Sequence, residues 1–239
     1  MVASIVAMAS TSVLAKSYCY EFSFSPYVGA AAQVANIDLQ TRFGKPLYQQ
    51  HLPMGSIFGG ARINEYFGVE VGFDTSKRKS QTRSIYPGEF LPGDALPLQA
   101  GQIRVFNTRL NMNSTNFGII GYLPLKSIGL ENMEILGGFG FSSVKVKAQH
   151  LLVDDEFEGL PDALTIARSS FKYKKRKFIS SFTLGLQNKI TNEFGWRLFV
   201  NWKNLSTFNK LTSRQNPNAI AKLQFKNSIA MGIGLYFSF

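Results

Sequence analysis

The sequence predicts an all-β protein, an eight-stranded antiparallel up-and-down transmembrane β-barrel. Three observations support this fold class. Long stretches alternate apolar with small or polar residues, and the connections between these stretches are short and long in turn. No run of about 18 apolar residues is present, so a membrane-spanning helix is not expected. Strands of about 9–11 tilted residues are enough to cross a bilayer, and most of these stretches are at least that long.

The C-terminal segment shows the clearest alternation. From Leu223 to Phe239 the odd positions are apolar except Asn227, whereas the even positions are mostly small or polar. Successive side chains of a strand point to opposite faces, so this segment has one apolar and one polar face. A helix cannot produce that pattern.

Seven further segments resemble it, which brings the expected number of strands to eight. They cover residues 22–34, 54–63, 67–74, 103–122, 133–148, 178–187 and 194–203. The alternation slips near Thr115 and near Ser142, and we interpret both places as β-bulges.

The connections differ in length in an ordered way. Those at 64–65, 124–132 and 190–192 are short, whereas those at 35–52, 79–101, 149–170 and 209–219 are long and polar. Transmembrane barrels have short periplasmic turns and longer extracellular loops. We therefore expect both chain ends in the periplasm and four mobile extracellular loops.

Alternation alone does not say which face points outward. A soluble lipocalin-like barrel also has eight antiparallel strands, with its apolar face turned inward to bind a ligand. Here small residues such as Gly68, Gly185 and Gly232 fall on the polar face, as a narrow lumen requires. Aromatic residues lie near the strand ends, as in interfacial girdles. These features favour an apolar face turned toward lipid, in a barrel closed by its first and last strands.

The N-terminal residues 1–15 are uncharged and end in Val13-Leu14-Ala15, which is similar to a signal-peptide cleavage site. The basic segment that usually opens such a signal is absent from these residues. Residues 16–239 would then form one barrel domain. The single cysteine, Cys19, excludes an intramolecular disulfide. We expect no metal and no cofactor.

The formal net charge of +11 at pH 7 suits an anionic partner. No nucleic-acid-binding motif accompanies it, so nucleic acid is not expected as a partner. Two basic runs lie at the predicted outer strand ends and could contact lipopolysaccharide phosphates, although a solvated strand extension explains them equally well. Their residues are Lys77, Arg78, Lys79, Lys172, Lys174, Lys175, Arg176 and Lys177.

Charged residues also fall on the predicted lumen face. An eight-stranded barrel is just wide enough to be filled by its own side chains, so buried charges there must pair. We expect a structural salt-bridge network, with a gated narrow ion path as the alternative. The residues are Glu21, Arg62, Glu70, Asp74, Arg109, Arg197, Lys203 and Lys226.

Two sequence elements resemble the OmpA/OmpX/opacity-type family of small outer-membrane barrels. They are the terminal residues 232–239, Gly-Ile-Gly-Leu-Tyr-Phe-Ser-Phe, and Gly121-Tyr122-Leu123-Pro124 followed by residues 136–140. The resemblance covers Phe22 to Phe239. It implies insertion in the outer membrane of a Gram-negative bacterium, and recognition of Tyr236, Phe237 and Phe239 by the barrel-assembly machinery.

No catalytic site is expected. The two histidines, His51 and His150, lie in predicted loops with no recognisable nucleophile nearby, and no Gly-x-Ser-x-Gly occurs. The sequence therefore favours a monomeric, non-enzymatic protein of the envelope. It would contact lipopolysaccharide, host or other surface ligands through its four extracellular loops. A narrow passive pore and a lipid-modifying enzyme remain alternatives.

Overall fold

The computed structural model describes residues 24–40, 47–77, 79–90, 96–157, 170–208 and 224–239. This part of the chain holds nine strands and two short 3-10 helices. The strands are β1 Ser25–Gln40, β2 His51–Arg62, β3 Phe67–Ser76, β4 Lys79–Ile85, β5 Gln102–Pro124, β6 Met133–Phe157, β7 Ser170–Lys189, β8 Phe194–Asn204 and β9 Gln224–Ser238. The helices are η1 Lys126–Ile128 and η3 Ser206–Phe208. Within the described ranges, no helix has the length and apolar character to span a membrane.

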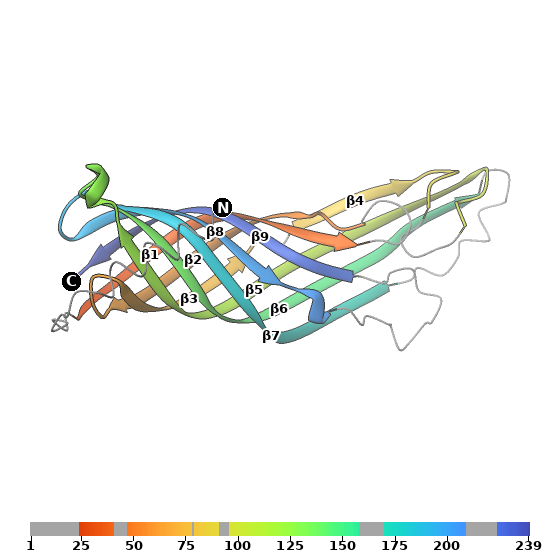
Figure 1. The fold of residues 1–239 in the computed structure, drawn as a ribbon. Helices are drawn as coiled ribbons and strands as arrows, with labels where there is room; N and C mark the ends of the chain where they lie inside the picture. The colour runs from red at the N-terminus through yellow and green to blue at the C-terminus, as the bar shows by residue number, and fades with distance from the viewer. Residues whose placement is uncertain (1–23, 41–46, 78, 91–95, 158–169, 209–223) are drawn as a thin grey trace.

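Eight of these strands form a closed antiparallel ring, which confirms the predicted fold class (Figure 1). The order around the ring is β3-β2-β1-β9-β8-β7-β6-β5, and pairing of β3 with β5 closes it. The first strand, β1, pairs with the last strand, β9, from Tyr27↔Ser238 onward. No strand edge is therefore left open to hydrocarbon along the closed part of the ring.

The two ends of the barrel differ strongly. At one end, here called the turn end, the connections 63–66, 125–132 and 190–193 are short, and the C-terminal residues lie there as well. At the other end, the loop end, β5, β6 and β7 run on beyond the ring (Figure 1). By the general rule for such barrels, the turn end is periplasmic and the loop end is extracellular.

Much of what the sequence predicted as loop is strand. The predicted loop 79–101 contains β4, which pairs with β5 alone among the described strands. The predicted loop 149–170 is shortened because β6 continues to Phe157. We call β4 together with residues 102–113, 144–157 and 170–177 of β5, β6 and β7 the extension. The extension is a paired sheet and not a set of separate loops.

On β5, β6 and β7 the large apolar side chains lie on the outer face along one part of the strand and on the inner face along the rest, and the change occurs at one row of residues. Thr115, Ser143 and Phe178 are register partners on β5, β6 and β7, and we call them the crossover row. Toward the turn end of this row, large apolar side chains such as those of Phe117 and Phe141 are exposed on the outside.

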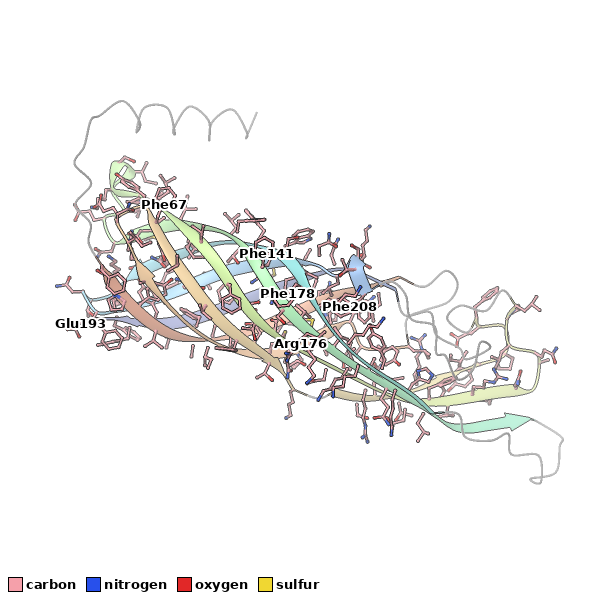
Figure 2. All side chains as sticks on the ribbon, turned by 90° about the horizontal axis from the view of Figure 1, so that it is seen from below. Phe67, Phe141, Arg176, Phe178, Glu193 and Phe208 are labelled. Atoms are coloured by element: carbon pink, nitrogen blue, oxygen red, sulfur yellow. The ribbon has the colours of Figure 1, made fainter. Side chains whose placement is uncertain are left out.

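Together with similar side chains they form a belt around the ring, made of Val28, Val34, Ile57, Phe67, Val69, Val71, Phe73, Ile119, Phe139, Phe182, Leu184, Leu198, Val200, Ile229, Met231, Ile233 and Leu235. Phe67 and Phe141 are labelled in Figure 2. Such a belt contradicts the soluble lipocalin-like alternative, because there the apolar face would point inward.

Beyond the crossover row the apolar side chains point inward. Met112, Val144 and Val146 are at most 1% exposed and belong to a large apolar core. An outward side chain meets lipid within the membrane and water beyond it, so the apolar face must change sides where the strand leaves the bilayer.

The predicted bulges at Thr115 and Ser142 are wrong for this reason. Both residues lie in uninterrupted register, and the β5–β6 pairing shifts only between Val105 and Phe106 among the described pairs.

Candidate functional site

The polar lumen near the turn end holds a connected pair of ion-pair clusters. Arg62 of β2 donates from both terminal guanidinium nitrogens to the carboxylate of Glu134 on β6, at 2.9 and 3.0 Å. Arg197 of β8 donates to Glu70 Oε2 on β3 at 2.6 Å. Gln187 of β7 links the two pairs, since it donates to Glu134 Oε2 at 2.6 Å and accepts from Arg197 Nη2 at 3.3 Å.

A third ion pair lies closer to the crossover row. Lys203 of β8 donates to Asp74 Oδ2 on β3 at 2.7 Å, and both side chains are almost fully buried. The Asp74 carboxylate also accepts from Ser56 at 2.5 Å, Ser114 at 2.7 Å and Asn116 at 2.8 Å. Every oxygen of this carboxylate is therefore satisfied, which is the condition for a buried charge to be tolerated.

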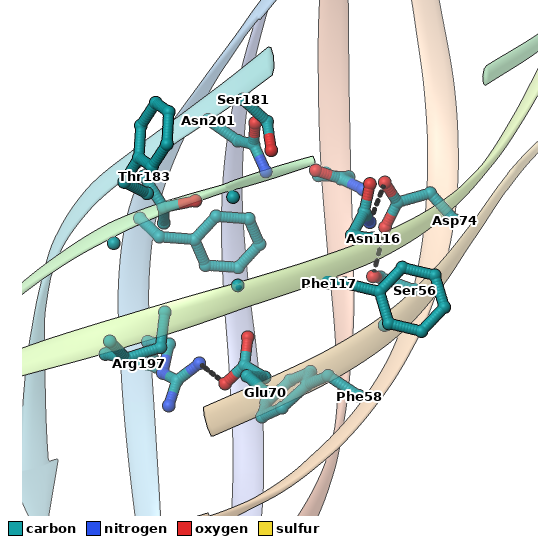
Figure 3. Close-up of a pocket in the computed structure, with 18 residues that line it drawn as sticks. Ser56, Phe58, Glu70, Asp74, Asn116, Phe117, Ser181, Thr183, Arg197 and Asn201 are labelled. Atoms are coloured by element: carbon teal, nitrogen blue, oxygen red, sulfur yellow. Dashed lines mark hydrogen bonds and ion pairs between the residues drawn. The ribbon is translucent and has the colours of Figure 1, made fainter. Parts of the chain in front are cut away.

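A small cavity separates the Arg197–Glu70 pair from the Asp74 cluster (Figure 3). Its volume is about 60 Å³, and Asn116, Ser181 and Asn201 contribute polar atoms to its wall. At about 10–15 Å³ of such volume per water, it has room for only a few water molecules. The three lumen pairs balance three cations against three anions among the described residues.

The sequence-predicted lumen residues divide into two groups in the structure. Arg62, Glu70, Asp74, Arg197 and Lys203 lie on the inner face and pair there. Glu134 was missed by the sequence reasoning, although it shares the even positions of β6 with the small residues Gly138 and Gly140 of the inner face. That shared parity is the signal that would have found it.

Arg109 and Lys226 do not face the lumen, so their placement there was wrong. Arg109 is exposed on the outer face of β5, because its neighbour Leu110 belongs to the buried core. Lys226 is exposed because the β1–β9 register shifts between Ile37 and Leu39 and turns Phe225 inward instead. Glu21 lies outside the described residues.

An apolar core fills the barrel between the polar lumen and the loop end. Its fully buried members include Leu52 of β2, Phe106 and Met112 of β5, and Leu205 and Phe208 after β8. The core continues through the inner face of the extension, where Val146 and Ala148 contribute. Close-packed apolar side chains of this kind exclude water from the space that they occupy.

The two histidines differ in their exposure to solvent. His51 is exposed at the start of β2, whereas His150 is buried on the inner face of the extension. His150 Nδ1 lies 2.8 Å from the Tyr48 hydroxyl, and its ring packs edge-on against Phe106. Burial lowers the pKa of His150 to about 4. It is therefore a neutral core residue, and among the described residues no cluster of His, Cys, Asp and Glu could hold a metal ion.

The basic run at the start of β7 is divided between the two faces of the strand. Lys172, Lys174 and Arg176 share the outward positions of Phe178, whereas Lys175 and Lys177 share the face of the buried Tyr173. Of the other predicted rim residues, Lys77 is exposed after β3, Lys79 begins β4, and Arg78 lies outside the described residues.

The C-terminal residues complete the ring at the turn end. Tyr236 points inward and packs edge-on against Tyr27, while Phe237 and Phe239 are exposed on the outside with ring centroids 5.2 Å apart. The predicted assembly signal thus presents two aromatic rings at the periplasmic boundary of the barrel.

The family model for the outer membrane protein beta-barrel domain matches residues 1–237. The chain belongs to this family. This membership, together with the closed ring and its apolar belt, places the protein in the outer membrane of a Gram-negative bacterium, as the sequence predicted. No curated protein sequence matches this barrel significantly.

Solved structures of outer-membrane proteins are similar to this chain at low sequence identity. Ail of Yersinia pestis, in complex with the heparin analogue sucrose octasulfate, is 10% identical, with a TM-score of 0.48 over 91% of this chain and 99% of its own. OprG of Pseudomonas aeruginosa is 11% identical, with a TM-score of 0.44 over 92% and 97%. The outer membrane protease OmpT of Escherichia coli is 13% identical, with a TM-score of 0.48 over 94% and 99%. At these scores the likeness supports no inference about ligand or activity.

Proposed function

We propose that the protein is a non-catalytic, non-conducting barrel that carries a rigid sheet above the outer membrane for surface contact. Its role would be in envelope structure and in interaction with lipopolysaccharide, host or other surface ligands. The barrel-assembly machinery would insert it as a monomer through Tyr236, Phe237 and Phe239.

The observation that carries this proposal is the apolar core above the lumen. A passive pore needs a continuous wet path, yet Phe106, Met112 and Phe208 pack across the interior beyond the Asp74–Lys203 pair. The lumen charges are paired with one another and not arranged along a free path. This supports a structural network in the lumen and leaves the outer surface of the extension as the interacting part.

A lipid-modifying enzyme is the alternative from a different class. The histidines give it little support, since His150 is buried against Tyr48 and Phe106 and His51 stands exposed at the start of β2. If the protein were such an enzyme, His51→Ala or His150→Ala would abolish release of fatty acid from phospholipid vesicles.

The test is conductance of the purified barrel in planar bilayers. We expect no stable unit current from folded protein, verified by a band whose mobility on an SDS gel changes on boiling. Stable unit conductance from the wild type would contradict the proposal and favour the narrow pore. Release of fatty acid by the wild type, lost in either histidine variant, would contradict it in favour of an enzyme.

A further inference from the structure

The outward face of β5, β6 and β7 carries a regular array of cations just beyond the crossover row. In the register of the sheet, Lys145 pairs with Arg176 and Lys147 pairs with Lys174, while Arg109 and Lys172 flank Gln149 one row further. Neighbouring strands lie about 4.8 Å apart and same-face residues about 7 Å apart, so these charges form a dense grid. We call the six residues Arg109, Lys145, Lys147, Lys172, Lys174 and Arg176 the cationic face.

None of these six residues forms an ion pair with an acidic side chain of the described residues. The lumen pairs and the periplasmic pair Lys126–Glu65 all lie elsewhere. The nearby charges of Lys147, Lys174 and Arg176 lower the pKa of Lys145. Like charges held this close are unfavourable, and a bound anion would relieve the repulsion.

The cationic face also has a shape suited to a ligand. A groove of about 420 Å³ runs along it, lined by Arg109, Lys147, Lys172 and Lys174 together with Asn111 and other residues of the same strands. Sites for small molecules are usually about 300–1,000 Å³. Cationic side chains bind phosphate groups through charge-assisted hydrogen bonds, and the groove offers several cations at once.

The position of the face decides between a soluble and a lipid-borne anion. On the same outward face, the row of Lys145 and Arg176 is followed by the exposed ring of Phe178 in the crossover row and then by that of Phe141 beyond it. Figure 2 shows Phe141, Phe178 and Arg176 following one another toward the extension. An amphiphile lying along these strands would meet apolar rings with its acyl chains and cations with its head group.

We propose that the cationic face is a binding site for a multiply phosphorylated lipid head group of the outer leaflet. This rests on the proposed function and makes it specific, because it assigns the contact to a strand face and not to loops. Three of its residues, Arg109, Lys145 and Lys147, were not among the contacts predicted from sequence. Lys175 and Lys177 fall outside it, since they lie on the opposite face and Lys177 Nζ donates to the Thr207 carbonyl oxygen.

Matched charge variants of the full-length protein provide the test. K147Q/K174Q removes two adjacent cations from the groove, whereas K126Q/K175Q removes the same charge from the periplasmic end and from the opposite face of β7. Each protein in neutral detergent is titrated with diphosphoryl lipid A, and bound lipid is counted by native mass spectrometry. We expect K147Q/K174Q to bind about 30-fold more weakly, since each cation near an anionic surface contributes roughly a factor of five. K126Q/K175Q should match the wild type.

Several results would overturn the proposal. One is equal lipid binding by K147Q/K174Q and the wild type, with both folded as judged by heat-modifiable mobility. Another is an equal loss in both double variants, which would mean that net charge and not the face decides. A third is binding of inositol hexakisphosphate, which has no acyl chains, as tightly as lipid A. That would assign the face to a soluble polyanion. Conductance in planar bilayers tests the proposed function separately, and a conducting wild type would leave the lipid titration unaffected.

Discussion

The buried Asp74–Lys203 pair allows the energetics of the lumen to be tested by a double-mutant cycle. Asp74→Asn keeps the size of the side chain and removes its charge, so that Lys203 loses its only ion-pair partner among the described residues. The Lys203 ammonium is buried and would retain only neutral acceptors, Ser114 Oγ at 2.7 Å and the amide oxygen of the new side chain. Breaking a buried pair from one side costs about 3–5 kcal/mol, because an uncompensated charge is left behind. We expect Asp74→Asn to lower the free energy of unfolding by an amount in that range.

The complementary variant is Lys203→Met, which leaves the carboxylate with three neutral donors, Ser56, Ser114 and Asn116. These hydrogen bonds offset part of the lost attraction, so Lys203→Met should cost less than Asp74→Asn. The double variant Asp74→Asn/Lys203→Met contains no buried charge at this place. Its cost should fall below the sum of the two single costs by about 2 kcal/mol or more, as expected for residues in direct contact.

Equilibrium unfolding by urea in lipid vesicles measures all four proteins, with the folded fraction taken from the mobility of unboiled samples. Additivity of the two single changes within about 0.5 kcal/mol would refute the reasoning, since it would show that the two charges do not interact. A double variant more stable than the wild type would not, because replacing a buried pair with uncharged side chains is often neutral or stabilising.

Two further predictions concern the extension and the membrane boundary. The pKa of His150 is lowered from 6.5 to about 4, so stability that is fully present above pH 6.5 should be lost as the pH falls toward 4, by about 3 kcal/mol in total. Hydrogen exchange in the outer half of β6, corrected for its intrinsic pH dependence, should reveal this loss. If His150→Gln showed the same loss of protection with falling pH as the wild type, the prediction would be contradicted. Ile119→Arg places a cation on the lipid face and should cost about 2–4 kcal/mol, whereas Thr82→Arg, at an exposed position of β4 in the extension, should cost almost nothing. Equal costs in the urea assay would show that the crossover row is not the membrane boundary.

The ring of eight strands could be predicted because alternation survives on every strand that faces lipid. Phe67, Val69, Val71 and Phe73 alternate with small or charged residues, and burial follows the same period in the structure. Five of the eight lumen charges were placed on the correct face by parity alone. The pairs that they form could not be predicted, because Arg197 and Glu70 lie 127 residues apart and meet only through ring closure.

The extension could not be predicted by applying one rule to a whole strand. On β5 the apolar residues lie at odd positions near Ile119 and at even positions near Leu110, so a single lipid-facing rule suggests a bulge between them. The assumption that the apolar face always points to lipid also led to the wrong placement of Arg109 in the lumen, because its apolar neighbours point inward there. At Lys226 the cause was different, since an irregular pairing with β1 can be detected only when both strands are seen together.

The crossover row also fixes how deeply the barrel sits. In an ordinary sheet, a slip of two residues between neighbours keeps every side chain on its own face and costs little in burial. Here the same slip on β6 would carry Lys145 toward hydrocarbon or leave Phe141 in water, because the change of side is marked at one height on adjacent strands. The strands are therefore aligned along their length as well as across the sheet. The crossover row therefore defines how deep the barrel lies in the membrane, and the residues on both sides of this row oppose displacement along the membrane normal.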